Sequence, residues 1–324
     1  MMNIVLCASD NYTMPCGVTI CSICENNRDK NINFYIITDK YFSENHKMQL
    51  RGVISKYPLK SIEFIIVSDE KIDQFIKYEN HWWTRHVFYR LLAADLLPSF
   101  INKTLYLDCD IIVRHSLDKL WETDLTNKAI GCVPDGMEGI IEYYNRLEYT
   151  SEKGYFNSGV LLINLAYWRN NNISNKFAKF IYEHGEKIKY PDQDVLNAVL
   201  KDCKLILPLT YNFQSTFLYK NNFRSFDYTK YKNQINATYE DPIILHLSGV
   251  RPWISGRMAH PYQQEFFRYR ALTIWKDEPL WPCNYTLKKK CIDKLRPILS
   301  KIGICNVIES PYDSKYQLKQ QSQK

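Results

Sequence analysis

The chain has 324 residues, of which 45% are apolar, 11 are glycine and 13 are proline. A chain of this length and composition can bury a large core, which excludes a disordered protein and predicts one large domain with or without an appendage. The formal net charge is +7, and residues 283–324 carry nine Lys or Arg against three Asp or Glu, so nearly all of the excess lies in this tail.

The first half of the chain alternates strand-like and helix-like segments. Ser43 is a suitable N-cap for the second helix, and Pro98 ends the third. The expected strands are 3–8, 32–39, 61–69 and 103–113, and the expected helices between them are 15–27, 43–57 and 84–97. This alternation predicts an α/β fold in which helices flank a mostly parallel sheet.

The second half is less regular. It contains expected strands at 159–165 and 242–249 and expected helices at 173–188 and 191–202. Three polar segments, "CASDNY", "ITDK" and "LDCD", follow strands of the first half. Ligands of parallel sheets bind beyond the carboxyl ends of the strands, so these segments predict a binding site at one edge.

The segment "LYLDCDIIV" places Asp108 and Asp110 one residue apart in an expected strand. Side chains of a strand alternate between its faces, so both carboxylates are predicted to point the same way. Burying two like charges costs several kcal/mol unless something neutralises them. The pair therefore calls for a counter-charge.

Three interpretations of this pair compete. Two solvated carboxylates at a strand end are the simplest. A haloacid-dehalogenase-type phosphatase also carries D-x-D after a buried strand, but here the motif lies past residue 100 and Ile112 replaces a small or hydroxyl residue. A divalent cation bound to a nucleotide diphosphate would neutralise both carboxylates, because hard cations take oxygen ligands and bridge phosphates.

Further motifs favour the third interpretation. The segments "LYLDCDIIVRHSLDKLW", "YFNSGVLLINLAYWR", "YPDQDVLN" and "HLSGVRPW" occur in this order, and "CASDNY" opens the chain. Together they resemble family 8 of the retaining glycosyltransferases, and within it the bacterial lipopolysaccharide galactosyl- and glucosyltransferases, over residues 1–282. The resemblance implies a GT-A fold with a Rossmann-like catalytic domain at 1–250 and an extension of that domain at 251–282.

The resemblance also implies the site. Asp108, Asp110 and His246 would hold Mn²⁺ or Mg²⁺, and Gln193 and Asp192 would be the catalytic candidates. The uridine would contact Ala8, Asp10, Asn11 and Tyr12; the diphosphate would contact Gly249 and Arg251; the sugar would contact Asn157, Asp192 and Gln193, and Arg90 would reach the sugar or its phosphate. Two positions depart from the family pattern, since Ser9 stands where an Asp is common and Arg251 where a Lys is common.

The implied reaction transfers glucose or galactose from UDP-glucose or UDP-galactose to a saccharide acceptor with retention at the anomeric carbon. Retention could arise from double displacement or from front-face attack, and front-face attack is favoured because an amide such as that of Gln193 is a weak nucleophile. Two other functions stay open: a self-glucosylating primer protein like glycogenin, and a non-catalytic UDP-sugar-binding protein. The choice of hexose and the identity of the acceptor also stay open.

The basic tail, 283–324, is a separate unit. Its segment 285–304 interleaves lysines with leucines and isoleucines at near-helical spacing, interrupted at Pro297. This pattern predicts a helical basic extension that binds an anionic membrane surface, with a helix packed on the catalytic domain or a solvated end as alternatives. Nucleic acid is not an expected partner, because stacking aromatic residues are scarce in the tail.

The N-terminus, the apolar runs and the cysteines indicate the cellular location of the protein. The N-terminus lacks the basic region and long apolar core of a signal peptide, and no run of eighteen apolar residues occurs. Ten cysteines are dispersed through apolar segments and are expected to be free thiols in a reducing compartment. The sequence thus predicts a cytoplasmic protein that binds peripherally to the inner face of the cytoplasmic membrane.

Overall fold

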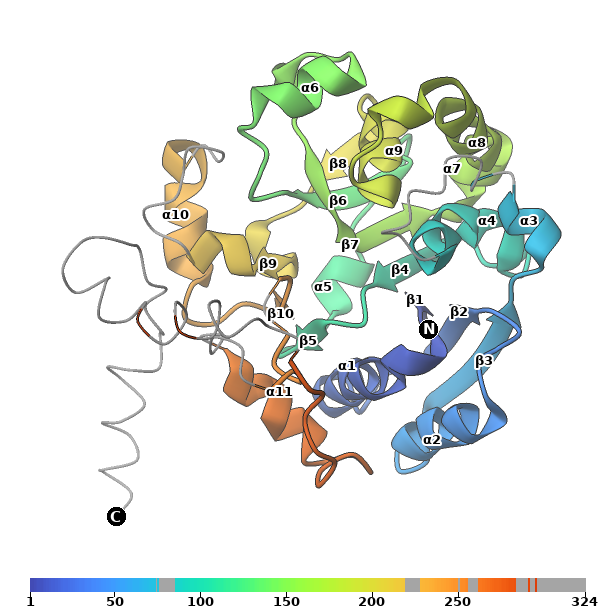
Figure 1. The fold of residues 1–324 in the computed structure, drawn as a ribbon, viewed down its shortest axis with the longest axis vertical. Helices are drawn as coiled ribbons and strands as arrows, with labels where there is room; N and C mark the ends of the chain where they lie inside the picture. Colours follow the sequence, from blue (N-terminus) through green and yellow to red (C-terminus); the bar gives the residue numbers. More distant parts are fainter. Residues whose placement is uncertain are drawn as a thin grey trace.

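The computed structural model describes residues 1–73, 75, 85–218, 228–249, 251–255, 262–283, 291 and 295. A seven-stranded sheet of order β3-β2-β1-β4-β7-β6-β8 forms the centre of this part of the chain. Helices cover both of its faces (Figure 1). This is the α/β architecture that the alternating segments predicted.

The first half of the sheet is parallel. It consists of β1 (Met2–Cys7), β2 (Ile32–Thr38), β3 (Lys60–Ile66) and β4 (Lys103–Leu107). The connections run through α1 (Thr13–Asn26) and α2 (Glu44–Ile54). The Ser43 side chain accepts a hydrogen bond from the backbone N–H of His46, so the predicted N-cap of α2 is confirmed.

The second half is mixed. Strand β7 (Phe156–Asn164) is antiparallel both to β4 and to β6 (Ile130–Pro134), and β8 (Lys204–Ile206) is parallel to β6. The sheet is therefore mostly parallel, as predicted, with one antiparallel strand in its middle. Because β7 runs against β4, the start of β7 lies beside the end of β4.

The predicted single strand 103–113 is wrong. Strand β4 ends at Leu107, and β5 (Ile111–Val113) belongs to a separate three-stranded sheet with β10 (Ile244–His246) and β9 (Phe213–Gln214). Residues 108–110 form the turn between the two sheets. The hydroxyl of Thr19 on α1 holds this turn by donating to the backbone oxygens of Cys109 and Ile111 at 3.0 and 2.8 Å. The two aspartates thus lie in a turn and not on one face of a strand.

Several expected helices differ in their bounds. The expected helix 84–97 is a 3₁₀ helix (Arg85–Leu92) followed by one turn of α-helix, and the expected helix 173–188 is α-helical only to His184. The other helices are α3 (Asp69–Asp73), α4 (Ala93–Leu96), α5 (Asp118–Trp121), α6 (Ile141–Leu147), α7 (Leu165–Asn170), α8 (Ile173–His184), α9 (Pro191–Leu200), α10 (Tyr228–Thr238) and α11 (Gln263–Arg270).

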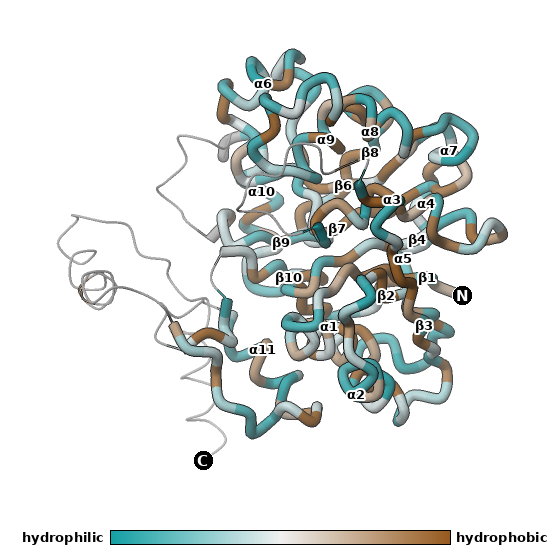
Figure 2. The backbone as a smooth tube through the Cα atoms, turned by 45° about the vertical axis from the view of Figure 1, so that its right-hand side comes forward, coloured by the Kyte–Doolittle hydropathy of each residue, from teal (hydrophilic) through white to brown (hydrophobic). Residues whose placement is uncertain are grey.

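Two large apolar clusters, one around Ile4 and one around Val5, make up most of the core. Neighbouring residues of β1 thus enter different clusters, as expected for a strand with helices on both faces. Hydrophobic segments gather inside the molecule and hydrophilic ones at its periphery (Figure 2). The nine cysteines of the described residues are all free thiols, as expected.

The segment that follows β10 packs against helix α1. Helix α11 lies on α1, and Ile254 forms a bridge with Trp281. The buried indole of Trp275 rests directly on Gly17 of α1, where a Cβ atom would overlap it. A glycine is therefore required at this point of close approach between the extension and the catalytic domain.

We expect Gly17→Ala to destabilise the fold by about 1–3 kcal/mol, because extra atoms in a packed core force their neighbours to shift. Gly52→Ala is the matched control: it also lies within a helix, and its Cβ would meet nothing within 4 Å. Alanine there should stabilise by roughly 0.5–1 kcal/mol through helix propensity. Urea unfolding measures both, and equal effects of the two substitutions would contradict the assigned packing.

The basic tail falls mostly outside the described residues. Of 283–324, the structure describes only Cys283, Cys291 and Leu295, so the predicted helical extension and its membrane contact are not tested by it. Within the described ranges, no helix combines the length and the apolar character that crossing a membrane requires.

Candidate active site

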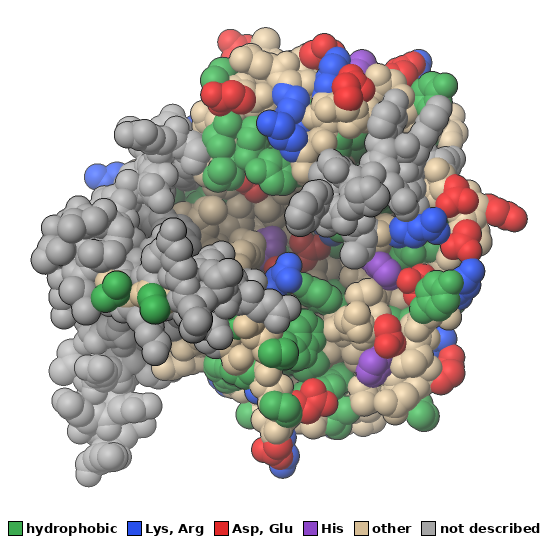
Figure 3. Space-filling view, viewed as in Figure 1, with side chains coloured by type: hydrophobic (Ala, Val, Ile, Leu, Met, Phe, Trp, Pro, Cys, Tyr) green, Lys and Arg blue, Asp and Glu red, His purple; other side chains and the backbone are tan. Residues whose placement is uncertain are grey.

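The predicted site residues gather where strands of both sheets end. Ala8 and Asp108 follow the neighbouring parallel strands β1 and β4, while Asn157 lies at the start of antiparallel β7. A hollow opens on this face of the molecule, and acidic and histidine side chains are visible on its floor (Figure 3). The ends of β1 and β4 and the start of β7 therefore meet at one edge of the sheet, whereas Asp39 of "ITDK" pairs with His86.

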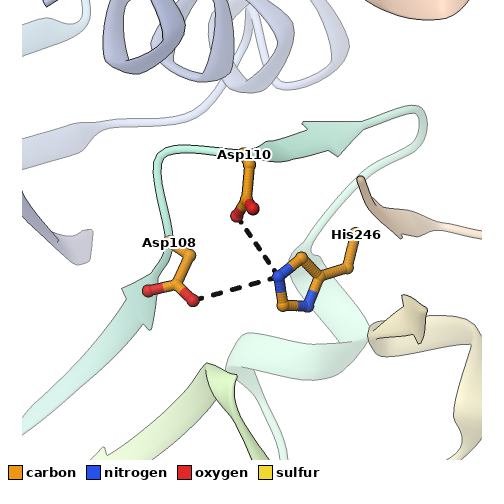
Figure 4. A group of neighbouring side chains, drawn as sticks. All are labelled: Asp108, Asp110 and His246. Atoms are coloured by element: carbon orange, nitrogen blue, oxygen red, sulfur yellow. Dashed lines mark ion pairs between the residues drawn. The ribbon is translucent and has the colours of Figure 1, made fainter. Parts of the chain in front are cut away.

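Asp108, Asp110 and His246 form a compact cluster in this site (Figure 4). His246 Nε2 lies 3.2 Å from Asp110 Oδ1 and 3.9 Å from Asp108 Oδ2. The antiparallel pairing of β10 with β5 sets His246 opposite Ile111, which places the imidazole beside the turn that carries both aspartates. Two segments far apart in sequence thus meet at a single point.

The charges in the cluster support one another. Burial by itself lowers the pKa of His246, but the carboxylates of Asp110 and Asp108 outweigh it and the pKa is raised. Burial by itself raises the pKa of Asp110, but His246 and the Arg251 guanidinium outweigh it and the pKa is lowered. Asp110 therefore stays ionised at neutral pH, and its negative charge is available to a cation.

These residues fit a divalent cation. Their ligand atoms lie within 4.8 Å of one another, and two carboxylates with one imidazole form a donor set that suits Mn²⁺. The backbone of Gly159 adjoins the cluster so closely that a Cβ there would lie 2.9 Å from Asp108 Oδ2 and would overlap the His246 ring. The lack of a side chain at Gly159 keeps room for these ligands.

Arg90 bridges the cluster to the sugar-site candidates. Its guanidinium lies 3.0 Å from Asp108 Oδ1 and 3.1 Å from Asp192 Oδ2, and it donates to the backbone oxygen of Ser158 at 2.9 Å. It also stacks on the ring of Tyr106, 4.4 Å from the centroid, while the Tyr106 hydroxyl donates to Asp108 Oδ1 at 2.6 Å. Arg90 thus neutralises two carboxylates of the protein itself.

Gln193 and Asn157 are in direct contact. Gln193 Oε1 accepts hydrogen bonds from the Ser158 backbone N–H at 3.0 Å and from Asn157 Nδ2 at 3.2 Å. Asp135 Oδ2 accepts hydrogen bonds from both amides, from Asn157 Nδ2 at 2.9 Å and from Gln193 Nε2 at 3.2 Å. The structure therefore brings the predicted sugar-site residues together and adds Asp135 to them.

The first turn of α9 is held by Asp194. This carboxylate is fully buried and accepts two hydrogen bonds from Arg146, one from the Tyr155 hydroxyl and two from backbone N–H groups at the start of the helix. A carboxylate in this position also opposes the positive end of the helix dipole. The anchored turn presents Asp192 and Gln193 to the site.

The predicted uridine end lies around a 3₁₀ turn, Asp10–Tyr12. Asp10 Oδ1 accepts from the Ser43 backbone N–H at 2.8 Å and lies 2.6 Å from His46 Nδ1, so its contacts are with α2. Ala8 is buried and Asn11 is exposed. These positions leave the predicted nucleotide contacts untested, and the contacts of Asp10 are those of a structural residue.

Tyr12 and Arg251, two other predicted donor residues, lie together. The Tyr12 ring packs edge-on against Trp253 and Trp281, with centroid distances of 6.2 and 5.8 Å, and the Arg251 guanidinium lies over it at 5.7 Å. Gly249 has a φ of +84°, a conformation that favours glycine. Three residues of the extension, Arg251, Trp253 and Trp281, therefore surround the Tyr12 ring.

Sequence reasoning missed Asp135 and Asn212. Asp135 directly follows the apolar strand β6, so the same strand-end signal that marked Asp108 could have found it. Asn212 is fully buried and contacts His246 and Asn157, each at 2.9 Å, but nothing in its local sequence indicates this.

Comparison with known proteins identifies the family of this chain. The chain matches the family model for glycosyl transferase family 8 over residues 3–256. It is 31% identical over 280 residues to general stress protein A of Bacillus subtilis (strain 168), covering 85% of this chain and 95% of the relative. It is 28% identical over 282 residues to lipopolysaccharide glucosyltransferase WaaO of Escherichia coli (strain K12), covering 85% and 79%.

A solved structure extends the comparison to the fold. Galactosyltransferase LgtC in complex with donor and acceptor sugar analogues superposes with a TM-score of 0.71 at 27% identity, covering 84% of this chain and 96% of that chain. The fold is therefore the GT-A-like α/β arrangement that the resemblance implied. With the ordered motifs and the Asp-Asp-His cluster, these matches show that the chain belongs to glycosyl transferase family 8 and is a glycosyltransferase.

Proposed function

We propose that this chain transfers glucose or galactose from a UDP-sugar to a saccharide acceptor of the cell surface, with retention of configuration. The observation that carries the proposal is the link that Arg90 makes between Asp108 of the Asp-Asp-His cluster and Asp192, the neighbour of Gln193 on α9. A cation-binding group beside a set of amides and carboxylates suits a donor whose diphosphate and sugar are adjacent. The glucosyltransferase and galactosyltransferase among its relatives support both the reaction and the two hexoses.

Each part of the site has a role in this proposal. Asp108, Asp110 and His246 would hold Mn²⁺ or Mg²⁺, which supplies Lewis-acid stabilisation of a leaving diphosphate when bound. Arg251 and the backbone at Gly249 would contact the diphosphate, since a guanidinium binds phosphate oxygens in bidentate geometry. Tyr12 would stack on the uracil ring, which requires Arg251 to leave the ring face that it covers.

Retention is assigned to front-face attack. The Gln193 amide is held by the Ser158 N–H and by Asn157, with its oxygen as the acceptor of both bonds. Such an amide is a weak nucleophile, but its dipole is fixed and can stabilise positive charge that develops on the sugar. Asp192 is bound to Arg90, which lowers its availability as a nucleophile.

We expect the first product to keep the α configuration of the donor. The proton spectrum of the product shows this directly through the coupling of its anomeric proton. A β-linked first product would contradict the retaining mechanism, whichever hexose is transferred.

The most direct test of the function is a screen of UDP-sugars with Mn²⁺. We expect UDP-glucose or UDP-galactose to raise the melting temperature and to be hydrolysed slowly, with other UDP-sugars weaker. Mass spectrometry of the protein after incubation separates the other candidate functions. Hexose added to the chain would indicate a self-glucosylating primer, and binding without turnover in the presence of lipopolysaccharide-type acceptors would indicate a non-catalytic binding protein.

The tail prediction belongs to the same proposal. A cytoplasmic enzyme with a lipid-anchored acceptor gains from a tail that binds anionic membranes, where each Lys or Arg contributes ~1 kcal/mol near the surface. We expect the full chain to sediment with anionic vesicles at low salt and to be released at high salt. Equal sedimentation of a chain that ends at Pro282 would leave the tail without this role.

A further inference from the structure

We propose that Asn212 is a positioning residue that sets the tautomer of His246, and that the backbone of β7 dictates this setting through a chain of amide hydrogen bonds. The inference rests on the proposed function only in treating Asp108, Asp110 and His246 as a cation site. It concerns the proton on the imidazole, which decides the ring nitrogen that is free to bind a cation.

The hydrogen-bond chain begins at Gly159 of β7. Asn157 Oδ1 accepts from the backbone N–H of Gly159 at 2.9 Å, and Asn157 Nδ2 lies 2.9 Å from Asp135 Oδ2. A backbone N–H can only donate, so the atom of Asn157 that faces it must be the oxygen. The backbone of β7 therefore fixes which way the Asn157 amide points.

Asn212 passes this orientation to His246. Its Nδ2 lies 2.9 Å from Asn157 Oδ1, and because that oxygen can only accept, Asn212 must present its NH₂ group there. The oxygen of Asn212 then points the other way, at 2.9 Å from His246 Nδ1. His246 must therefore carry a proton on Nδ1.

This tautomer suits a metal ligand. Without a cation, Nε2 carries a second proton and pairs with Asp110 Oδ1 at 3.2 Å. A bound cation would replace that proton at Nε2, and the proton on Nδ1 would stay in place. A metal-bound histidine generally donates its other ring N–H to a fixed acceptor, and loss of that partner weakens metal binding. Asn212 is such an acceptor, and it is fully buried, so water does not compete with it.

The same strand also fixes the sugar side of the site. The N–H of Ser158, one residue before Gly159, donates to Gln193 Oε1 at 3.0 Å. Two successive N–H groups of β7 thus orient the Gln193 amide and, through Asn157 and Asn212, the His246 ring. Backbone groups of one strand therefore orient both halves of the site.

The test examines the ring nitrogens of His246 in the full-length protein, with and without the diamagnetic cation Mg²⁺. Long-range ¹H–¹⁵N spectra of labelled histidine show which ring nitrogen carries a proton, and His246→Ala assigns the signal. In the wild type we expect a proton on Nδ1 in both states and loss of the Nε2 proton when Mg²⁺ binds. Asn212→Leu, which offers no acceptor, should shift His246 towards Nε2–H and weaken Mn²⁺ binding by roughly 10–100-fold in titration calorimetry.

Asn27→Leu is the matched control. Asn27 is buried like Asn212, but its amide bonds to the backbone at Ile23 and Leu117, away from the site. It should lower stability with an unchanged His246 tautomer and Mn²⁺ affinity. An Nδ1 without a proton in the wild type, or a wild-type spectrum and affinity in Asn212→Leu, would overturn the proposal; if Asn212→Leu does not fold, the wild-type spectrum decides. A wild type that shows Nδ1–H but does not bind Mn²⁺ would instead overturn the cation site of the proposed function.

Discussion

Asp110→Asn is expected to lower transfer by about 10³-fold or more, because a Lewis acid supplies several kcal/mol of transition-state stabilisation. Asp110 is the better of the two aspartates for this experiment. Asp108 also accepts one hydrogen bond from the Tyr106 hydroxyl and forms an ion pair with Arg90, so its replacement would disturb the packing as well. The Asp110 carboxylate pairs with His246. An asparagine amide has nearly the same shape as this carboxylate, so the substitution should leave the packing intact.

The control for Asp110→Asn is Asp241→Asn. Asp241 also pairs with a histidine, since its Oδ1 lies 2.7 Å from His115 Nε2, but it is exposed and precedes β10, whose other end carries His246. It should leave turnover and Mn²⁺ affinity unchanged. Calorimetric titration of Mn²⁺ and a melting curve separate loss of the cation from loss of the fold. Near-normal turnover in Asp110→Asn, or full activity of the wild type in excess chelator, would remove the cation from the proposed reaction.

Arg90→Met is expected to lower the free energy of unfolding by roughly 3–5 kcal/mol near neutral pH and to abolish transfer, because removing one partner leaves buried charge uncompensated. Arg90 and Asp192 are both buried, and Asp108 is the second carboxylate that loses its partner. Arg28→Met is the control: Arg28 forms a surface pair with Glu25, and such pairs contribute about 0–1 kcal/mol.

The defect of Arg90→Met should depend on pH. Burial raises the pKa of Asp192 in the wild type, and the Arg90 guanidinium opposes this rise, so the pKa should rise further without Arg90. A carboxyl group with a raised pKa binds its proton more tightly in the folded state than in the unfolded one. The stability that the Asp192 carboxyl group contributes is therefore lost as the pH rises from the pKa of the unfolded state through the raised pKa of the folded state.

Urea unfolding at pH 5 and pH 8 checks this sign. The difference in unfolding free energy between Arg90→Met and the wild type should be larger at pH 8 than at pH 5. An equal difference at both values would mean that the lost packing on Tyr106, and not the uncompensated Asp192 carboxylate, sets the defect. The Arg28→Met difference should stay small at both values.

Much of the fold was predictable because its signals are local. Apolar runs separated by helical segments marked β1, β2, β3 and β4, and capping chemistry marked the start of α2 at Ser43. The polar residues that follow these strands indicated the edge that carries the site. The family was recognisable because several motifs occur in a fixed order, which is far more specific than the two aspartates alone.

The break between β4 and β5 was not predictable from the same signals. The residues on both sides of the turn are apolar, so a continuous strand and two strands in different sheets give the same pattern in a short window. The turn exists because β5 pairs with β10 and because Thr19 of α1 binds its carbonyls. These partners come from distant parts of the chain.

The α/β class and the family could be inferred from the order of residues along the chain, and the family resemblance in turn implied the three candidate cation ligands. That Arg90 joins two carboxylates, that Asp135 belongs to the site and that Asn212 contacts His246 became visible only in the folded chain. This difference follows from the range of the interactions. Hydrophobic periodicity and capping act between neighbours in sequence, whereas a buried polar group takes its hydrogen-bond partner from whichever segment the packing places beside it.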